Sequence, residues 1–220
     1  MKISNRLKKI GDLVDTNSLI LDIGCDHALL DIYLVKEKKI KKAIASDIAK
    51  LPLEHAKENI KKYNLEDKIE LRLGEGLKTY SDEVDTVVIS GMGGRGIISI
   101  LKDDLDITKK IKTFIISPNN YQQDVREFLV KNGFIITDEV LMKEKNIFYQ
   151  IIKVEKGKKK YSSKQLYFGP VILEKKGPIF NEYYKNELKK KEIVLKLLPK
   201  SMFIRKYKLK KEIKLIRNSL

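Results

Sequence analysis

One largely apolar segment and the turn that follows it set the fold class expected for this chain. Leu19–Ile23 stops at Gly24, and a second apolar run ends at Ser46 and Asp47, 23 residues beyond Gly24. Such a run predicts a buried strand that ends in a tight turn and opens a helix. In open α/β sheets, ligands bind at the carboxyl ends of strands, where an acid on the second strand accepts both ribose hydroxyls. The spacing therefore favours an α/β domain that binds a nucleoside.

The rest of the first 155 residues alternates between strand and helix patterns. Strands are expected at 18–23, 42–47, 68–73, 84–90 and 111–117. Helices are expected at 4–15, 28–37, 50–63, 93–102 and 121–132. Two further runs, 134–142 and 147–154, indicate an antiparallel hairpin at the sheet edge. This pattern predicts a seven-stranded, mostly parallel sheet covered on both faces, the Rossmann-like arrangement typical of class I methyltransferases.

Positive charge is concentrated in the last part of the chain. Residues 1–155 contain 26 Lys and Arg against 25 Asp and Glu, whereas residues 156–220 contain 20 against 5. A general lysine bias would have acted on both parts, so the difference favours a polyanionic partner for the second. Two helical stretches, 178–199 and 201–220, predict an α-helical hairpin whose apolar stripes pack together. We expect a nucleoside-binding domain over 1–155 and a basic helical domain over 156–220.

The turn at Gly24 distinguishes between two classes of nucleoside ligand. A dinucleotide site uses three glycines in the pattern G-x-G-x-x-G, whereas this turn carries one. Its backbone is therefore not shaped to receive a pyrophosphate. A nucleoside without phosphates, such as S-adenosylmethionine, suits this turn better than a nicotinamide dinucleotide.

Polar or glycine-rich loops follow four of the predicted strands. They are 22–27, 74–77, 90–95 and 117–120. Since the carboxyl ends of parallel strands meet at one edge of a sheet, these loops should come together. The residues expected to bind the cofactor are Asp22, Gly24, Cys25, Asp26, His27, Asp47, Ile48, Gly74, Glu75, Gly76, Gly91 and Met92.

Several of these positions also have a structural interpretation. Asp26 is suited to bind the ammonium group of methionine, and equally suited to cap the helix that follows. His27 either lines the pocket or bonds to the backbone, and Cys25 is expected to be a small packed residue. His55, in a lysine-rich helix, is expected on the surface. The glycine loops and the Pro-Asn turn have ordinary turns as their alternative.

Eight short stretches match a known family. They are 4–7 (SNRL), 22–27 (DIGCDH), 74–77 (GEGL), 84–85 (VD), 91–94 (GMGG), 118–119 (PN), 138–139 (DE) and 168–170 (FGP). On these stretches the chain resembles the bacterial tRNA (adenine-22-N1)-methyltransferases, the TrmK family, over essentially its whole length. The resemblance implies a domain that binds S-adenosylmethionine and a C-terminal helical domain that helps to grip tRNA. It also implies methylation of N1 of adenine 22.

Two positions depart from the family pattern. Ser117 stands where the family commonly has Gln before the Pro-Asn pair. Asp47 stands where the family usually has Glu. Asp is the shorter of the two acids, and its carboxylate can still accept from a ribose.

The implied reaction assigns roles to individual residues. S-adenosylmethionine carries a good leaving group, so the enzyme mainly has to align adenine N1 with the methyl group. The adenine must leave its stack to reach the cofactor. An acceptor for its exocyclic amine would raise the nucleophilicity of N1; Asn119, Asp26 and carbonyls near Gly91 are candidates, and Asn119 is expected to position the base. The expected substrate-binding residues are Arg6, Arg95, Pro118 and Asn119, with the two arginines on phosphates.

Composition narrows the compartment and leaves rival functions open. The single cysteine excludes an internal disulfide, and no apolar stretch is long enough to span a bilayer. We expect a cytoplasmic monomer that binds tRNA, without a metal and without a membrane. The rivals are a methyltransferase acting on another RNA or a small molecule, and a non-catalytic RNA-binding protein with a vestigial cofactor fold. A dehydrogenase is disfavoured by the single-glycine turn.

Overall fold

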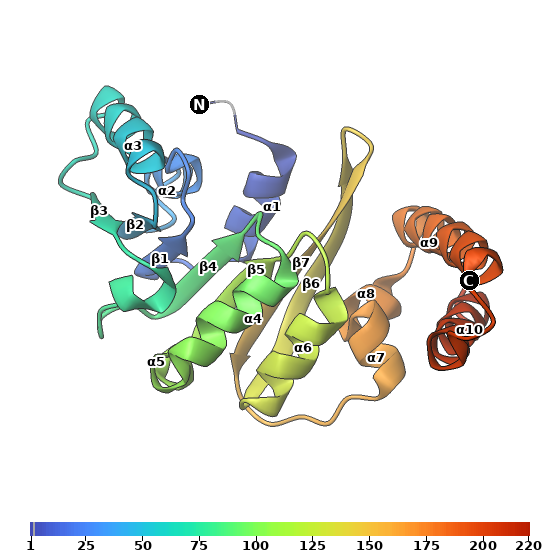
Figure 1. Cartoon of the computed structure of the whole chain (residues 1–220). Coiled ribbons are helices and arrows are strands. Elements are labelled where there is room, and N and C mark those ends of the chain that lie inside the picture. The colour runs from blue at the N-terminus through green and yellow to red at the C-terminus, as the bar shows by residue number, and fades with distance from the viewer. Residues whose placement is uncertain (2) are drawn as a thin grey trace. The chain divides into compact units, whose positions relative to one another are not determined.

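The predicted sheet is present in the computed structural model, which describes residue 1 and residues 3–220 (Figure 1). Within these residues, seven strands form one sheet in the order β3-β2-β1-β4-β5-β7-β6. The strands are β1 (Ile20–Ile23), β2 (Ala43–Asp47), β3 (Ile69–Leu73), β4 (Thr86–Ser90), β5 (Thr113–Ser117), β6 (Phe134–Glu144) and β7 (Ile147–Lys156). β1 to β5 are parallel, and β7 is antiparallel to β5 and β6. The predicted fold class, with its edge hairpin, is confirmed.

The predicted helices are also present, and shorter ones lie between them. The helical segments are α1 (Asn5–Leu13), α2 (Leu29–Lys36), α3 (Lys50–Lys62), η1 (Gly76–Thr79), α4 (Gly94–Asp103), α5 (Leu105–Lys110), α6 (Gln122–Lys131), α7 (Ser163–Phe168), α8 (Pro170–Lys175), α9 (Pro178–Leu197) and α10 (Phe203–Arg217). The sequence predictions lacked η1, α5, α7 and α8. Each of these spans six residues or fewer, which is too short to show a helical period.

Helices cover both faces of the sheet, so its central strands are buried on two sides. Ile20 of β1 packs with apolar residues of α1, α2 and α3. Its neighbours Leu21 and Ile23 point to the opposite face, where they pack with residues of α4 and α6. Side chains alternate along a strand, so Asp22 shares the α2 face with Ile20. The packing of β1 in the core therefore determines which face of the sheet each side chain before the turn at Gly24 points to.

A buried polar cluster links α6 and the β6–β7 hairpin to the last residues of the first unit. Arg126 of α6 donates to Glu139 Oε1 and to Gln150 Oε1, each at 2.6 Å. The other oxygen of Glu139, Oε2, accepts from the backbone N–H of Val171 at 3.0 Å. Arg126 and Glu139 are fully buried, so each neutralises a charge that would otherwise lie unpaired in the core. The cluster ties the start of α8 to the sheet.

The chain divides into two compact units, Met1–Val171 and Ile172–Leu220. This division falls later in the chain than the boundary expected at residue 155. The segment that follows β7 packs on the first unit: the Tyr161 hydroxyl accepts from the Ile136 N–H at 2.9 Å, and Leu166 joins the α4 and α6 core. Although the segment is rich in lysine, its apolar residues pack on the first unit.

The second unit is built on the predicted helical hairpin. Phe180 and Tyr184 of α9 and Ile213 and Ile216 of α10 are buried. Lys176 Nζ donates to the backbone oxygen of Ser219 at 2.7 Å, which ties the start of the unit to its last residues. Among the described residues, no helix of either unit has the length and apolar character needed to cross a membrane.

Candidate active site

Two adjoining cavities open at the carboxyl ends of the parallel strands. The first has a volume of about 450 Å³ and the second about 380 Å³. Gly24, Asp47 and Met92 line both. Gly24 follows β1, Asp47 ends β2 and Met92 follows β4. The chain adds β2 and β3 on one side of β1 and then continues with β4 on its other side, so the strand order reverses between β1 and β4. This is the switch point at which open α/β sheets bind ligands.

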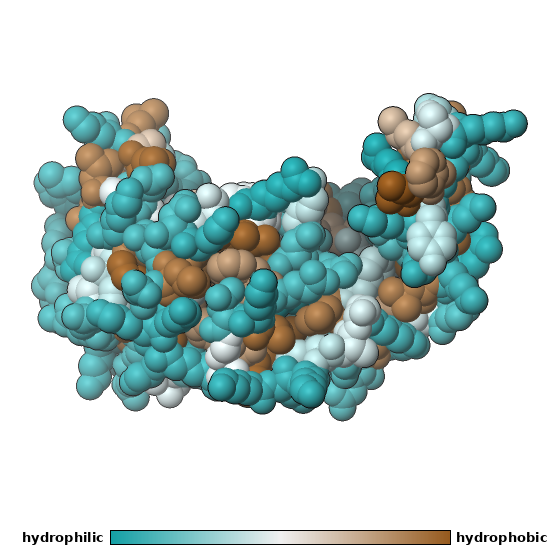
Figure 2. All heavy atoms as spheres, turned by 60° about the horizontal axis from the view of Figure 1, so that its bottom comes forward, coloured by the Kyte–Doolittle hydropathy of each residue, from teal (hydrophilic) through white to brown (hydrophobic). Residues whose placement is uncertain are grey.

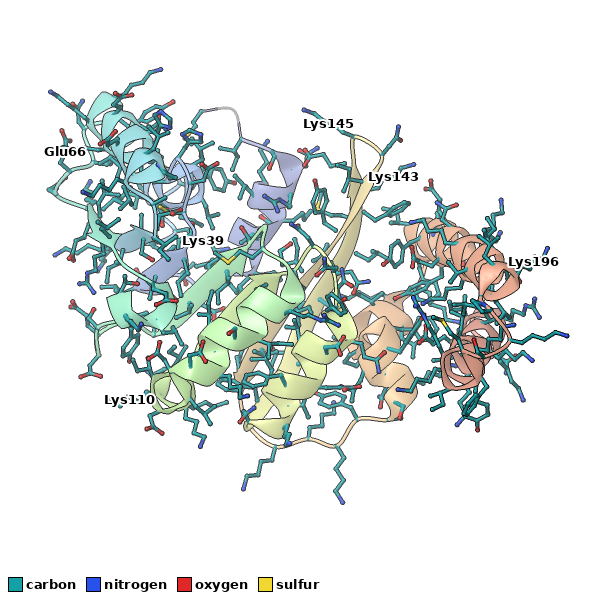
Figure 3. The ribbon with its side chains drawn as sticks, viewed as in Figure 1. Lys39, Glu66, Lys110, Lys143, Lys145 and Lys196 are labelled. Carbon is teal, nitrogen blue, oxygen red and sulfur yellow. The ribbon has the colours of Figure 1, made fainter. Side chains whose placement is uncertain are left out.

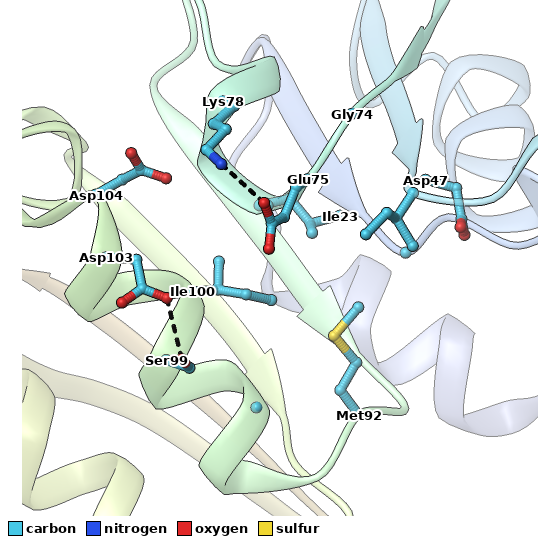
Figure 4. A pocket seen from close by; sticks show the side chains of 14 residues that line it. Ile23, Asp47, Gly74, Glu75, Lys78, Met92, Ser99, Ile100, Asp103 and Asp104 are labelled. Carbon is cyan, nitrogen blue, oxygen red and sulfur yellow. Dashed lines mark hydrogen bonds and ion pairs between the residues drawn. The ribbon is translucent and has the colours of Figure 1, made fainter.

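The first cavity has apolar walls and acidic edges (Figure 4). Ile48 and Ile100 supply flat apolar surface, and Ile48 is 70% exposed. The Glu75 carboxylate lies at the rim, where Lys78 Nζ donates to it at 2.8 Å. Across the opening, the Ser99 hydroxyl donates to Asp103 at 3.0 Å. Apolar walls with a few polar groups are typical of a site for a flat heterocycle.

The turn after β1 is compact because two backbone donors share one acceptor. The N–H groups of Gly24 and Cys25 donate to the carbonyl oxygen of Ser46 at 2.9 and 3.0 Å. Gly24 has a φ of +74°, and a Cβ there would meet the Met92 methyl at 2.5 Å. A larger residue at position 24 would both strain the backbone and push Met92 out of the cleft.

Asp47 ends β2 at the junction of the two cavities. Its Oδ1 accepts from the backbone N–H of Ala49 at 2.9 Å, which fixes the carboxylate. The second carboxylate oxygen can accept from a ligand hydroxyl, which is the chemistry that an acid at this position offers a ribose.

The second cavity is lined by the DIGCDH turn and by α1. Asp26 is exposed there in a left-handed conformation, with a φ of +52°. The residue that caps α2 is Ala28, without a side-chain capping bond, so the capping alternative for Asp26 was wrong. His27 stacks on His55 with ring centroids 5.0 Å apart, and its Nε2 lies 3.5 Å from Asp26. His55 therefore packs beside the site and is not the isolated surface residue that we expected.

A pair of buried carboxyl groups lies beneath this turn. Asp22 is 4% exposed, and Asp31 of α2 is fully buried against it. Loss of water raises the pKa of Asp22 to about 7, while Arg6 opposes the shift. Burial also raises the pKa of Asp31 well above its ordinary value, and the nearby Asp22 charge adds to the effect. Two ionised carboxylates would repel each other there, so the pair holds a proton.

Cys25 lies in the same turn without nucleophilic character. It is buried, and loss of water raises the pKa of its thiol, with the nearby aspartates adding to the shift. The thiol therefore stays protonated and acts as a small packed side chain, as expected.

The loop after β5 is fastened to the loop after β4. Asn119 Nδ2 donates to the carbonyl oxygen of Gly91 at 2.6 Å, and its backbone N–H donates to Met92 O at 2.9 Å. The next residue, Asn120, accepts from the Gly94 N–H at 3.0 Å. Because Nδ2 is the donor to Gly91, the side-chain oxygen of Asn119 is the end that can accept from a ligand amine.

Comparison with known proteins identifies the family. The family model TrmK, described as tRNA (adenine(22)-N(1))-methyltransferase, matches residues 20–218. The chain belongs to the TrmK family. It is 31% identical to the tRNA (adenine(22)-N(1))-methyltransferase of Bacillus subtilis, over 86% of this chain and 82% of the relative.

Two solved structures of TrmK proteins cover almost the whole chain. The M1A22 tRNA methyltransferase TrmK of Bacillus subtilis has a TM-score of 0.91 at 28% identity, covering 99% of this chain and 98% of that one. Mycoplasma capricolum TrmK, in complex with its cofactor product S-adenosyl-homocysteine, has a TM-score of 0.88 at 30% identity, covering 99% and 97%. The resemblance stated from short motifs is thereby confirmed.

In this TrmK family member, all twelve predicted cofactor residues line the two adjoining cavities. Those on the first cavity are Gly24, Asp47, Ile48, Gly74, Glu75, Gly76 and Met92. Those on the second are Asp22, Gly24, Cys25, Asp26, His27, Asp47, Gly91 and Met92. Asn119 joins them through its bonds to the loop after β4, while Pro118 is buried beneath, its carbonyl accepting from Gln122.

The two predicted phosphate-binding arginines differ in position. Arg6 is half-buried and lines the second cavity, with its guanidinium 5.1 Å from the Tyr149 ring centre. Arg95, in the first turn of α4, is exposed and lies 4.3 Å from the Tyr121 ring centre. Arg95 is therefore placed for an outer contact, whereas Arg6 faces the cleft.

Sequence reasoning missed Asp31 and Tyr121. Asp31 stands in an apolar helix pattern, LLDIYLV, and a lone acid in such a pattern is a signal that we did not use. Tyr121 follows the Pro-Asn turn with a φ of +53° and is 42% exposed. A bulky residue in the left-handed region is strained, and such strain is common at functional sites.

Proposed function

We propose that this TrmK family member transfers a methyl group from S-adenosylmethionine to N1 of adenine 22 in tRNA. The observation that carries the proposal is the family match over residues 20–218, which spans both the cleft and the basic helical unit. The cleft suits the cofactor: it pairs apolar walls with acceptors and has a glycine turn that no side chain fills.

The first cavity would hold the adenosine part of the cofactor. S-adenosylmethionine, when bound, supplies a methyl group on a positively charged sulfur. Asp47 would accept from the ribose hydroxyls, since one of its oxygens is already fixed by Ala49. Ile48 and Ile100 would sandwich the adenine, and Glu75 would accept from its exocyclic amine.

The second cavity would hold the methionine part of the cofactor. Asp26 would accept from the ammonium group, and the exposed left-handed turn leaves its carboxylate available at the cavity wall. Arg6 faces the same cavity and would pair with the carboxylate of methionine. This role replaces the tRNA phosphate contact that the sequence suggested for Arg6.

Asn119 would position the target adenine. Its Nδ2 donates to Gly91 O, so its side-chain oxygen is oriented to accept from the exocyclic amine of the base. Such a bond aligns N1 toward the methyl group and stabilises the positive charge that the ring gains on methylation. Tyr121 and Arg95, which stack on each other, would hold the flanking nucleotide and its phosphate.

The basic unit would grip the tRNA. Residues 172–220 contain 15 Lys and Arg against 5 Asp and Glu, so they would gain affinity by releasing counterions from RNA. Both parts of the cleft come from one chain, and we propose that the protein acts as a cytoplasmic monomer.

The direct test is methylation of an unmodified tRNA transcript followed by mass spectrometry of its nucleosides. We expect 1-methyladenosine with the natural transcript and none when adenine 22 is replaced by guanine. The Asp47→Ala variant should lose cofactor affinity, which calorimetry with S-adenosyl-homocysteine measures without any tRNA. Cofactor binding without a methylated nucleoside would reject the tRNA reaction and favour a small-molecule substrate.

A further inference from the structure

The tip of the helical hairpin, residues 193–211, has an unusual surface. Most buried contacts of α9 and α10 lie toward the base of the hairpin, at Phe180, Tyr184, Ile213 and Ile216. At the tip, large apolar side chains face solvent instead. The most exposed are Leu197 at 77%, Phe203 at 70%, Ile204 at 61% and Tyr207 at 60%.

The same segment is strongly basic. Residues 193–211 contain seven Lys and Arg and no Asp or Glu. The ion pairs Lys191–Glu212 and Arg217–Glu192 use acids that lie just outside it. Lys196 extends outward from α9 (Figure 3), and Lys211 lies 4.5 Å from the Tyr207 ring centre. Apolar and hydrophilic side chains alternate over the surface of these helices (Figure 2).

This combination selects a ligand that has both a flat apolar face and negative charge. Paired RNA presents phosphates and sugars, which lysines alone can bind. Unpaired nucleotides also present bases, and these stack on exposed aromatic rings while lysines follow the backbone. Phe203 and Tyr207 are four residues apart on α10, so their rings lie on one side of the helix.

We propose that the tip of the hairpin binds unpaired nucleotides of the substrate tRNA, with bases stacked on Phe203 and Tyr207. This proposal rests on the proposed function for the identity of the RNA. The basic residues of segment 193–211 hold the phosphates of the same nucleotides. The tip is thus a second tRNA contact, built from the hairpin alone.

Tryptophan fluorescence tests the stacking directly, because the chain contains no tryptophan. The Phe203→Trp variant places a single reporter at the tip, and stacking of a base quenches it. The control is Leu220→Trp, an exposed apolar position just beyond the end of α10 and roughly 25 Å from Phe203. We expect tRNA and a short single-stranded RNA to quench the tip reporter, with little effect on the control reporter.

Affinity gives the second readout. The double variant Phe203→Ala/Tyr207→Ala should bind tRNA at least about 5-fold more weakly in filter binding, as expected for the loss of one stack or more. Its affinity for S-adenosyl-homocysteine should match the wild type. The variant Leu220→Ala, which removes an exposed apolar side chain outside the tip, should bind tRNA like the wild type.

Other outcomes would overturn the proposal. Equal quenching of the two reporters by RNA would show that RNA binding is not localised at the tip. Quenching by anionic vesicles but not by RNA would show that the tip binds a membrane surface instead. Unchanged tRNA affinity in the double variant would show that bases do not stack on Phe203 and Tyr207. These results are independent of the methylation assay: a wild type that fails to methylate adenine 22 would reject the proposed function, while quenching by RNA would still stand.

Discussion

Asp31 places a second carboxyl group under the cofactor turn, and the shared proton links folding stability to pH. Both Asp22 and Asp31 have a raised pKa because of burial. The folded protein therefore keeps protons that the unfolded chain loses above its ordinary carboxyl pKa of 3.8. Stability from this pair is complete below that value and falls as the pH rises through about 7.

The Asp31→Asn variant should remove a proton that the pair retains in the folded protein. The slope of unfolding free energy against pH, between pH 5 and 7, should become less negative by about 1.4 kcal/mol per pH unit. Urea unfolding at several pH values measures it. Asp67→Asn, which removes an exposed carboxyl group, controls for the loss of one negative charge. An unchanged slope in Asp31→Asn would mean that the pair does not retain the proton.

Asn119 is the residue whose loss should affect chemistry more than binding. Asn119→Ala removes the proposed acceptor for the adenine amine and should lower kcat about 100-fold, the loss typical of one transition-state hydrogen bond. The dissociation constant of S-adenosyl-homocysteine should not change. Asn120→Ala is the matched control, since Asn120 caps the Gly94 N–H and should mainly affect stability. Equal kcat values for the two variants would contradict the assignment.

At the scale of elements, the buried Arg126–Glu139 pair fixes the chain where the first unit ends. Gly169 crowds the pair: a Cβ there would lie 2.5 Å from Glu139 Oε2 and 2.7 Å from Arg126 Nη2. The DE and FGP stretches, distant in sequence, are therefore parts of one structural device. Their presence in the family motif has a reason in packing.

Removing one partner of this pair should be costly. Arg126→Met removes the guanidinium that pairs with the buried Glu139 carboxylate and should lower the unfolding free energy by about 3–5 kcal/mol. The double variant Arg126→Met/Glu139→Leu should recover part of this loss, because both charges of the pair are then gone. Urea unfolding of the two variants and the wild type measures the difference. A double variant as unstable as the sum of both single variants would argue against charge pairing.

At the scale of the whole molecule, the distribution of charge should make tRNA binding depend on salt more strongly than cofactor binding does. The cofactor would be held in a cleft of the first unit, whereas the tRNA backbone would be bound mainly by the more basic second unit. Raising the salt concentration from about 50 to about 200 mM should raise KM for tRNA by at least about tenfold. The dissociation constant of S-adenosyl-homocysteine should change little.

Charge removal at the hairpin tests the same point. Lys206→Gln/Lys208→Gln should reduce the slope of log KM for tRNA against log salt by about 1 to 2. Lys110→Gln is the control, because Lys110 already pairs with Asp82 in the first unit. A slope that both variants reduce equally would show that tRNA binding is not localised to the hairpin.

Local patterns along the chain were enough to predict the sheet, its connecting helices and the loops that form the cleft. These follow from periodicity and from glycines such as Gly24, whose backbone requirements are read directly from the chain. The uneven distribution of lysine and arginine also separated the balanced part of the chain from the basic part.

Which residues meet in the folded protein, when they lie far apart in the sequence, depends on packing that no local pattern specifies. Asp31 meets Asp22 because side-chain alternation in β1 turns Asp22 toward α2, and Arg6 faces the cleft because α1 packs on that same side of the sheet. Likewise, the segment after β7 joins the first unit through Tyr161 and Leu166, against its lysine-rich composition. Tyr207, which is exposed at the hairpin tip, lies on an apolar stripe whose periodicity predicted packing between the two helices. Periodicity fixes which face a residue occupies, and only the folded chain decides what, if anything, covers that face.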